Sequence, residues 1–305
     1  AMKLHEHDKY NGSLRARKSY FFLDDRIIAL GSNVRSALDE SEVHTTLFQT
    51  EAASTDKVPQ LNGRKLTAIP FDKTVKTNLV ELGDGFGNYF FVRDAEVTIR
   101  RSEQHSLHEE TDEPTQHPFS LAYINHGDKA RKADGYEYMV LVQPDSKQVS
   151  TVQRALKKNE LYRVLQRDSM IHSIIDLSTG ITASVYFESG KGVGAVAEVN
   201  QPCLLMYRQP ASNQMILSVA DPDLRLYEGP SDEQYDENGK RIERTIYSRD
   251  WINNPSKEGL LTITLKGKWS IQENQWAKIT DASENLTRIT VKTQHGLSRE
   301  IRLYR

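Results

Sequence analysis

The sequence lacks several features that would assign a function class at once. It has one cysteine, Cys203, so neither an internal disulfide nor a multi-thiolate zinc site can form. It shows no run of about 18 apolar residues and no secretory signal, and the missing signal leaves the compartment open. Its 40 Lys and Arg balance 42 Asp and Glu, and a formal charge of −2 supplies no net field for phosphates. We therefore expect neither nucleic acid nor membrane as a partner.

The residues that are present predict two folded β domains. With 305 residues, 37% hydrophobic and 27% charged, the chain is long for one domain and apolar enough to bury a core. Helical patterns are scarce, whereas short runs of Tyr, Phe, Val, Ile and Thr alternate with Gly, Asp and Asn, which is typical of strands and hairpins. This pattern favours two antiparallel β-sandwich domains with a boundary near residues 145–160.

Individual segments carry more detailed predictions. Residues 18–33 read as a strand, an Asp24-Asp25 turn, a second strand and an exit at residues 31–33. Residues 78–101 contain turn signals at residues 83–88 and again at Asp94.

One short connecting helix is expected over residues 150–159. Ser150 is its candidate N-cap, and Val152, Ala155 and Leu156 share one helical face. The polar, charged residues 228–259, which contain prolines and glycine, read as a long surface excursion.

Two segments resemble cofactor sites and are interpreted otherwise. The run GKGVGAV, residues 190–196, is followed by a strand-like sequence instead of the helix that a phosphate loop needs, so we expect a turn. Residues 105–117 bring together three histidines and four carboxylates, which could ligate a metal, but their spacing matches no defined motif. A solvated acidic loop is favoured there, and no cofactor or metal is predicted.

The candidate binding residues are Arg100, Arg101, Gln104 and His105, at the end of a strand. Arginine forks suit the carboxylates and sulfates of an anionic polymer. Adjacent residues point to opposite faces of a strand, so at most one of the two arginines would face the ligand, and a surface cross-strand pair is the alternative. Aromatic residues could stack on sugar rings or fill the core: Tyr136, Tyr138, Tyr162, Trp251, Trp269 and Trp276.

A family resemblance emerges from the order of the strand motifs. The segments LRARKSYFFLDDRIIALGSNV, HTTLFQT, LAYINHG, GYEYMVLV, QPCLLMY and MILSVADPD resemble, in that order, the C-terminal half of polysaccharide lyases of the hyaluronate and chondroitin lyase family, family eight. The segments RRSEQHS, ELYRVLQRD and GKW most resemble chondroitin sulfate ABC lyases. The resemblance implies a large antiparallel super-sandwich over residues 1–148 and a smaller C-terminal β-sandwich over residues 149–305.

The resemblance also implies a reaction. Enzymes of this family cleave glycosaminoglycans such as chondroitin sulfate, dermatan sulfate or hyaluronan by β-elimination and leave an unsaturated uronate. Their catalytic histidine, tyrosine and arginine lie on an N-terminal α/α toroid, and a glutamate lies early in the super-sandwich. None of these has a matching position here, so no catalytic residue is carried over.

The expected role is therefore a non-catalytic β half, inactive alone. It would support a toroid of the same parent enzyme and line a cleft for a glycosaminoglycan, in a secreted or periplasmic setting. Residues 228–259 depart from the family pattern and look like an insertion. Two alternatives remain open: an autonomous carbohydrate-binding module, and an enzyme with its own site around residues 105–117.

Overall fold

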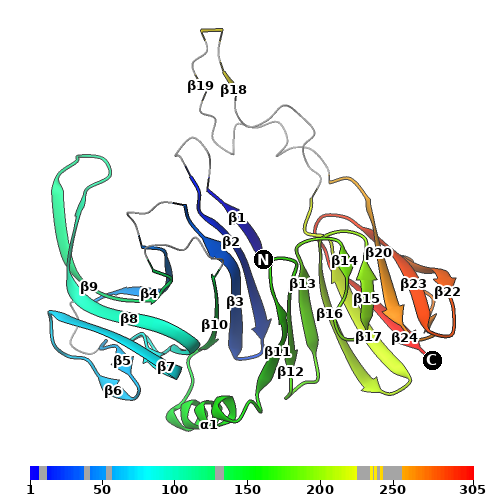
Figure 1. Cartoon of the computed structure of the whole chain (residues 1–305), viewed down its shortest axis with the longest axis horizontal. Helices are drawn as coiled ribbons and strands as arrows, with labels where there is room; N and C mark the ends of the chain where they lie inside the picture. Colours follow the sequence, from blue (N-terminus) through cyan, green and yellow to red (C-terminus); the bar gives the residue numbers. More distant parts are fainter. Residues whose placement is uncertain are drawn as a thin grey trace. The chain divides into compact units, whose positions relative to one another are not determined.

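The described part of the protein is almost entirely β-structure (Figure 1). The computed structural model describes residues 1–6, 12–37, 42–52, 57–127, 134–224, 234–235, 237–238, 241–242 and 256–305. The chain divides into two compact units, Ala1–Ser178 and Thr179–Arg305, each of which makes most of its contacts within itself. The all-β expectation is confirmed, while the division expected at residue 148 stays a prediction. No helix within the described ranges has the length and apolar character that crossing a membrane requires.

The first unit is built on a ten-stranded antiparallel sheet. Eight strands pair in the order β1-β2-β3-β10-β8-β7-β5-β6, and β9 pairs with β8 on one side and β4 on the other. The strands are β1 (Met2–His5), β2 (Arg15–Leu23), β3 (Arg26–Arg35), β4 (His44–Glu51), β5 (Gln60–Leu61), β6 (Arg64–Lys65), β7 (Phe71–Gly83), β8 (Tyr89–Leu107), β9 (Pro114–Asn125) and β10 (Asp134–Leu141). The helix α1 (Ser146–Lys157) and the hairpin β11 (Tyr162–Arg167) and β12 (Ile171–Asp176) complete the unit.

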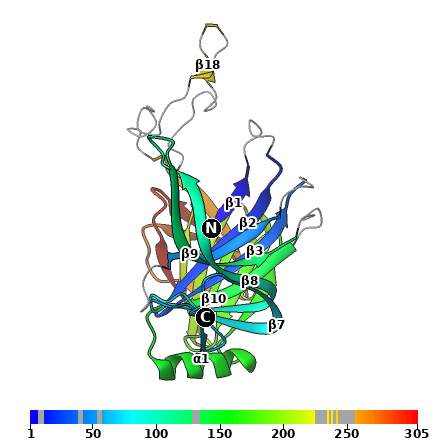
Figure 2. The same ribbon diagram turned by 90° about the vertical axis from the view of Figure 1, so that its left-hand side faces the viewer.

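Alternating apolar residues place a core cluster on one face of this sheet. Val80, Val92, Val97, Ile99 and Ile124 are buried in one cluster, as period-two patterning requires. The β8–β9 hairpin extends beyond its neighbours β7 and β4 and curves along its length (Figures 1 and 2). The far end of the hairpin is polar and exposed. The hairpin as a whole carries most of the residues considered below.

The second unit contains two antiparallel sheets. One contains strands in the order β13 (Thr182–Tyr186), β16 (Cys203–Ala211), β17 (Gln214–Ala220), β24 (Arg299–Tyr304) and β21 (Ser270–Ile271); the other has the order β14 (Gly190–Lys191), β15 (Val196–Val199), β20 (Gly259–Lys266), β23 (Leu286–Thr293) and β22 (Ala277–Ala282). The strands β18 (Gln234–Tyr235) and β19 (Arg241–Ile242) pair with each other. The expected turn over residues 190–196 joins β14 to β15 and is confirmed, whereas the excursion at 228–259 lies largely outside the described residues.

Three local predictions were wrong, each for a physical reason. Residues 31–33 continue β3 instead of leaving it, because Gly31 makes room for the Tyr136 ring, which a Cβ would overlap. Asp94 lies within β8 with φ of 48°, and β8 keeps the same register with β7 on both sides of it, so the strand continues. The helix begins earlier than expected, since Asp145 and Gln148 form a capping box and Ser150 instead donates back to Ser146 O.

Candidate functional site

The four predicted binding residues divide between the two faces of β8. Arg100 pairs in register with Asp72 on β7, and Gln104 pairs with His117 on β9. Alternation places Arg100 and Gln104 on one face and Arg101 and His105 on the other. Arg100 is 47% exposed at its side chain and Arg101 is 2% exposed, so the expected separation of the two arginines is confirmed.

Arg101 is occupied by contacts inside the protein. Its Nη1 donates to Leu66 O at 2.6 Å, its Nε donates to the Ser120 hydroxyl at 3.1 Å, and Nη2 reaches Ala52 O at 3.5 Å. Burial lowers the pKa of this guanidinium from its ordinary value. The side chain thus ties the segment before β7 and the end of β4 to the centre of the sheet.

Arg100 belongs to a largely polar face across β7, β8, β9 and β4, on which the half-buried Phe119 and Leu121 lie among the polar side chains. We call this the polar face; the side chains that share it by register are Asp72, Arg100, Gln104, His117, Tyr123, His44, Gln49 and Glu51. Arg100 Nε donates to Asp72 Oδ2 at 2.7 Å, and this hydrogen bond raises the arginine pKa. Gln49 Nε2 donates to Gln104 Oε1 at 2.7 Å, and His117 Nε2 lies 3.0 Å from Glu51 Oε1.

One end of the polar face is organised around His44. Its ring stacks on that of Tyr123, with centroids 3.9 Å apart and an angle of 25° between the planes. Its Nε2 lies 2.8 Å from Glu42 Oε2, and Asn125 Nδ2 donates to Glu42 Oε1 at 3.4 Å. The hydrogen bond from His44 lowers the pKa of Glu42, with a further contribution from Asn125. The cluster presents a ring, an amide and a carboxylate side by side.

The polar face has the chemistry of a surface that holds sugars. Side-chain amides donate hydrogen bonds to hydroxyl groups and accept them, carboxylates accept them, and the cation Arg100 can attract an acidic sugar. His105 lies outside this arrangement, on the opposite side of β8 and 69% exposed, with Nε2 3.7 Å from Glu103 Oε1. The structure therefore brings together Arg100 and Gln104, but not Arg101 and His105.

The remaining candidates from the sequence lie elsewhere. The segment from His105 to His117 is exposed almost throughout, and within the described residues no three His, Cys, Asp or Glu side chains are placed to share a metal ion. Four of the six aromatic residues are core residues: Tyr136, Tyr138, Tyr162 and Trp269. Trp276 is half-buried, with the Arg299 guanidinium 3.7 Å from its ring centroid, and Trp251 lies outside the described residues.

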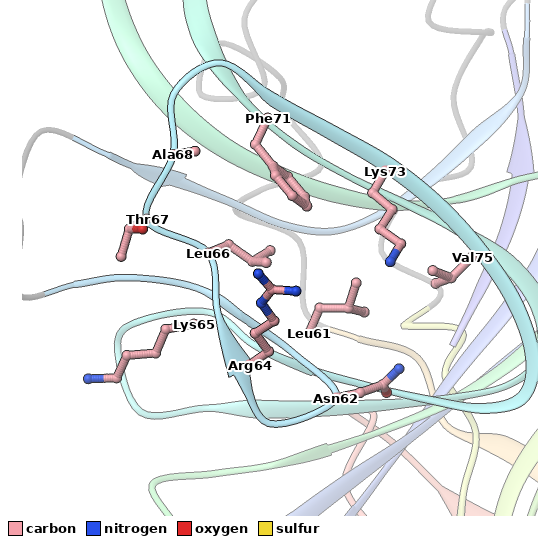
Figure 3. Close-up of a pocket in the computed structure, with 10 residues that line it drawn as sticks. All are labelled: Leu61, Asn62, Arg64, Lys65, Leu66, Thr67, Ala68, Phe71, Lys73 and Val75. Carbon is pink, nitrogen blue, oxygen red and sulfur yellow. The ribbon is translucent and has the colours of Figure 1, made fainter.

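Sequence reasoning missed two features of the first unit. The His44 cluster joins residues about 80 positions apart, which no local pattern reveals, although alternation along 44–51 and 114–125 places its members on one face. The second feature is a pocket beside the β5–β6 hairpin and β7, lined by three cationic side chains (Figure 3). The Asn62-Gly63 turn between β5 and β6 is a recognisable hairpin signal and is the feature of the sequence that could locate this pocket.

Two sequence profiles of one protein family match the chain. The profile of the polysaccharide lyase family 8 super-sandwich domain matches residues 1–153. The profile of the polysaccharide lyase family 8 C-terminal beta-sandwich domain matches residues 163–225. The resemblance inferred from the strand motifs is thereby confirmed.

Individual relatives are similar over nearly the whole chain. The chondroitin sulfate ABC exolyase of Bacteroides thetaiotaomicron is 37% identical over 305 residues, which are 99% of this chain and 28% of that protein. The corresponding exolyase of Proteus vulgaris is 35% identical over 90% of this chain and 27% of that protein. A solved structure of a Paenibacillus xanthan lyase superposes with a TM-score of 0.71 at 17% identity, covering 99% of this chain and 27% of that one, a likeness of fold alone. The chain thus spans little more than a quarter of these relatives.

Proposed function

Because the chain belongs to polysaccharide lyase family 8, we propose that it is the non-catalytic β part of a glycosaminoglycan lyase. The observation that carries the proposal is the pair of family profiles in chain order, combined with 37% identity to a chondroitin sulfate ABC exolyase. Chondroitin sulfate and dermatan sulfate are the proposed polymers, with hyaluronan as a further member of the same class.

The proposed reaction is β-elimination at a uronic acid. A base removes the proton from C5, the electron pair forms the C4–C5 double bond, and the 4-linked sugar leaves with a proton from an acid. Donors must also hold the developing negative charge on the carboxylate. The family resemblance assigns these roles to residues that have no matching position in this chain, so we propose that an α/α toroid of the parent enzyme supplies them.

The polar face is the part of this chain that we propose contacts the polymer. Arg100 is cationic and exposed, and Gln104 and Gln49 already form an amide pair beside it. An anionic chain lying along β8 and β9 would exchange the Arg100–Asp72 contact for one with its own carboxylate or sulfate. Arg101 does not contact the polymer in this proposal; it holds in place the backbone that lies behind the polar face. His105 lies on the opposite side of β8 and could contact only a ligand bound there.

The setting follows from the substrate class. Glycosaminoglycans are extracellular polymers too large to enter a cell intact, so we propose that the parent enzyme is secreted or periplasmic. The proposed partners are the toroid and the polysaccharide, without a cofactor held by this chain.

A second candidate function is an autonomous carbohydrate-binding module. It is favoured by Trp276, which lines a groove of about 630 Å³ together with Asn274, Lys278, Thr290 and Lys292. Tryptophan beside hydrogen-bonding side chains is a common arrangement for stacking a sugar ring. A module that binds through this groove would lose retention on an immobilised glycosaminoglycan in Trp276→Ala, whereas the β part proposed above would keep it in Trp276→Ala and lose it in Arg100→Ala.

The lyase proposal is tested by activity. The folded chain is incubated with chondroitin sulfate, alone and with the toroid polypeptide of the parent enzyme, and the ultraviolet absorbance of the unsaturated uronate is followed. We expect turnover only in the mixture. Turnover by the chain alone would overturn the non-catalytic assignment, and a mixture as inactive as either part would overturn the supporting role.

A further inference from the structure

A pocket of about 410 Å³ opens beside the β5–β6 hairpin on the first unit (Figure 3). Its walls come from the hairpin, from residues 66–68 and from the first residues of β7. Phe71, Lys73 and Val75 on β7 alternate with Asp72, which belongs to the polar face. The pocket therefore lies on the opposite side of β7 from the polar face and is a separate site.

The pocket is strongly cationic. Arg64 and Lys73 point toward a common space, whereas Lys65 on the same hairpin, also a lining residue, directs its ammonium group away from that space (Figure 3). Among the described residues that line the pocket there is neither aspartate nor glutamate. Asp72 bonds Arg100 on the other side of β7, and Glu81 accepts a hydrogen bond from Gln153 at 2.8 Å. Within the described residues, no ion pair links Arg64 or Lys73 to a carboxylate of the protein.

An apolar floor completes the pocket. Leu61 and Leu66 are buried, and Phe71 and Val75 are half-buried, with the Phe71 ring turned toward Arg64 and Lys73 (Figure 3). An apolar and aromatic surface packs against the C–H faces of a sugar ring. A planar guanidinium and an ammonium above it match an oxyanion, since arginine binds sulfate and carboxylate through paired hydrogen bonds.

The pocket is held in shape by the rest of the unit. The hairpin turn uses Asn62 and Gly63 with φ of 48° and 76°, the positive values that a tight two-residue turn requires. Asn62 Oδ1 accepts from Glu81 N at 3.0 Å. On the other side, the Arg101 guanidinium donates to Leu66 O and holds the wall in place. A site fixed in this way loses little freedom when it binds.

We propose that this pocket binds one sulfated sugar unit of an anionic polysaccharide, with Arg64 and Lys73 holding the sulfate and Phe71 supporting the ring. The choice of a polysaccharide as ligand rests on the proposed function; the cationic character of the pocket does not. The pocket would be a second binding site for the polymer, in addition to the polar face.

The test compares two charge-removing variants. Arg64→Gln combined with Lys73→Gln removes the cations that face the pocket, and Lys65→Gln removes a neighbouring cation that points away. Binding of a chondroitin 4-sulfate hexasaccharide and of its chemically desulfated form is measured by isothermal titration calorimetry at low salt. We expect the double variant to bind the sulfated probe at least about tenfold more weakly, because two charge-assisted contacts are lost. Lys65→Gln should bind like the unaltered chain, and binding of the desulfated probe should not differ between variants.

Three outcomes would contradict the proposal that this pocket binds a sulfated sugar. These are undetectable binding of the sulfated probe to the unaltered chain, unchanged binding in the double variant, or an equal loss in Lys65→Gln, which would reveal a diffuse surface charge effect only. Circular dichroism confirms that each variant is folded. Because binding is scored without turnover, a failure of the lyase proposal in the activity assay is separate from a failure here.

Discussion

At the scale of single residues, the most informative group is a buried histidine. His172 on β12 is 0% exposed and lies between two serine hydroxyls, with Nδ1 2.8 Å from Ser19 Oγ and Nε2 2.7 Å from Ser32 Oγ. Ser32 donates its own proton to Asp168 O at 2.6 Å, so its oxygen must accept from Nε2–H. Nδ1 then accepts from Ser19, and the neutral ring satisfies both serines.

This arrangement predicts a loss of stability in acid. Burial, with help from the nearby Arg167, lowers the pKa of His172 from 6.5 to about 4. Between about pH 6.5 and pH 4, His172 is protonated in the unfolded chain but stays neutral in the folded protein. The free energy of unfolding therefore decreases as the pH falls from about 6.5 to 4. The histidine's share of that decrease is about 2 to 3 kcal/mol.

Urea unfolding at pH 7 and pH 4.5 measures the effect. His172→Gln can still bond to both serines but does not titrate, so its stability should fall less between the two pH values than that of the unaltered chain. If both proteins lose the same free energy of unfolding between the two pH values, His172 does not contribute to the loss of stability in acid.

A second residue-scale prediction concerns the buried ion pair of Arg26 and Asp176. Arg26 Nη2 lies 3.0 and 3.2 Å from the two carboxylate oxygens, and both residues are buried. Arg26→Ala leaves a buried carboxylate without its main partner, and we expect a loss of about 3 to 5 kcal/mol in the free energy of unfolding. The double variant Arg26→Met with Asp176→Asn should recover part of this loss, because no buried charge remains. Chemical denaturation measures both, and an equal or larger loss in the double variant would be the contrary result.

At the scale of elements, β8 shows how one strand serves two purposes. The consecutive residues Arg100 and Arg101 of β8 have the same side chain but opposite environments. Alternation directs Arg100 to the exposed polar face and Arg101 to the buried face of the sheet. The exposed residue is available to a ligand, whereas the buried residue joins β8 to β4, β9 and the segment before β7.

The two arginines therefore form a matched pair for mutation. Arg101→Met leaves the Leu66 carbonyl and the Ser120 hydroxyl without their donor, and we expect a loss of about 2 to 4 kcal/mol. Arg100→Ala removes an exposed pair with Asp72 and should cost at most about 1 kcal/mol. Thermal and urea unfolding compare the variants, and similar losses would argue against the structural role of Arg101.

The limits of prediction from sequence are visible in the same elements. Period-two patterning predicts the strands and the separation of Arg100 from Arg101, because these depend on local geometry. Asp94 predicts a turn because aspartate is a frequent turn residue, yet pairing on both sides holds it in the strand. Cross-strand partners such as His44 and Tyr123 depend on which strands pair, a property of the whole sheet that no short window contains.

At the scale of the whole molecule, the chain is a member of polysaccharide lyase family 8 that spans little more than a quarter of its relatives' length. We propose that the polar face and the cationic pocket beside the β5–β6 hairpin hold an anionic polymer, while the proposed chemistry resides on the toroid.

The central claim is that the chain binds but does not cleave. The most direct measurement is the absorbance of unsaturated uronate during incubation of the folded, purified chain with chondroitin sulfate, followed by addition of the parent toroid to the same sample. We expect no increase above the buffer control before the addition and steady product formation after it. Product formation before the toroid is added would contradict the account.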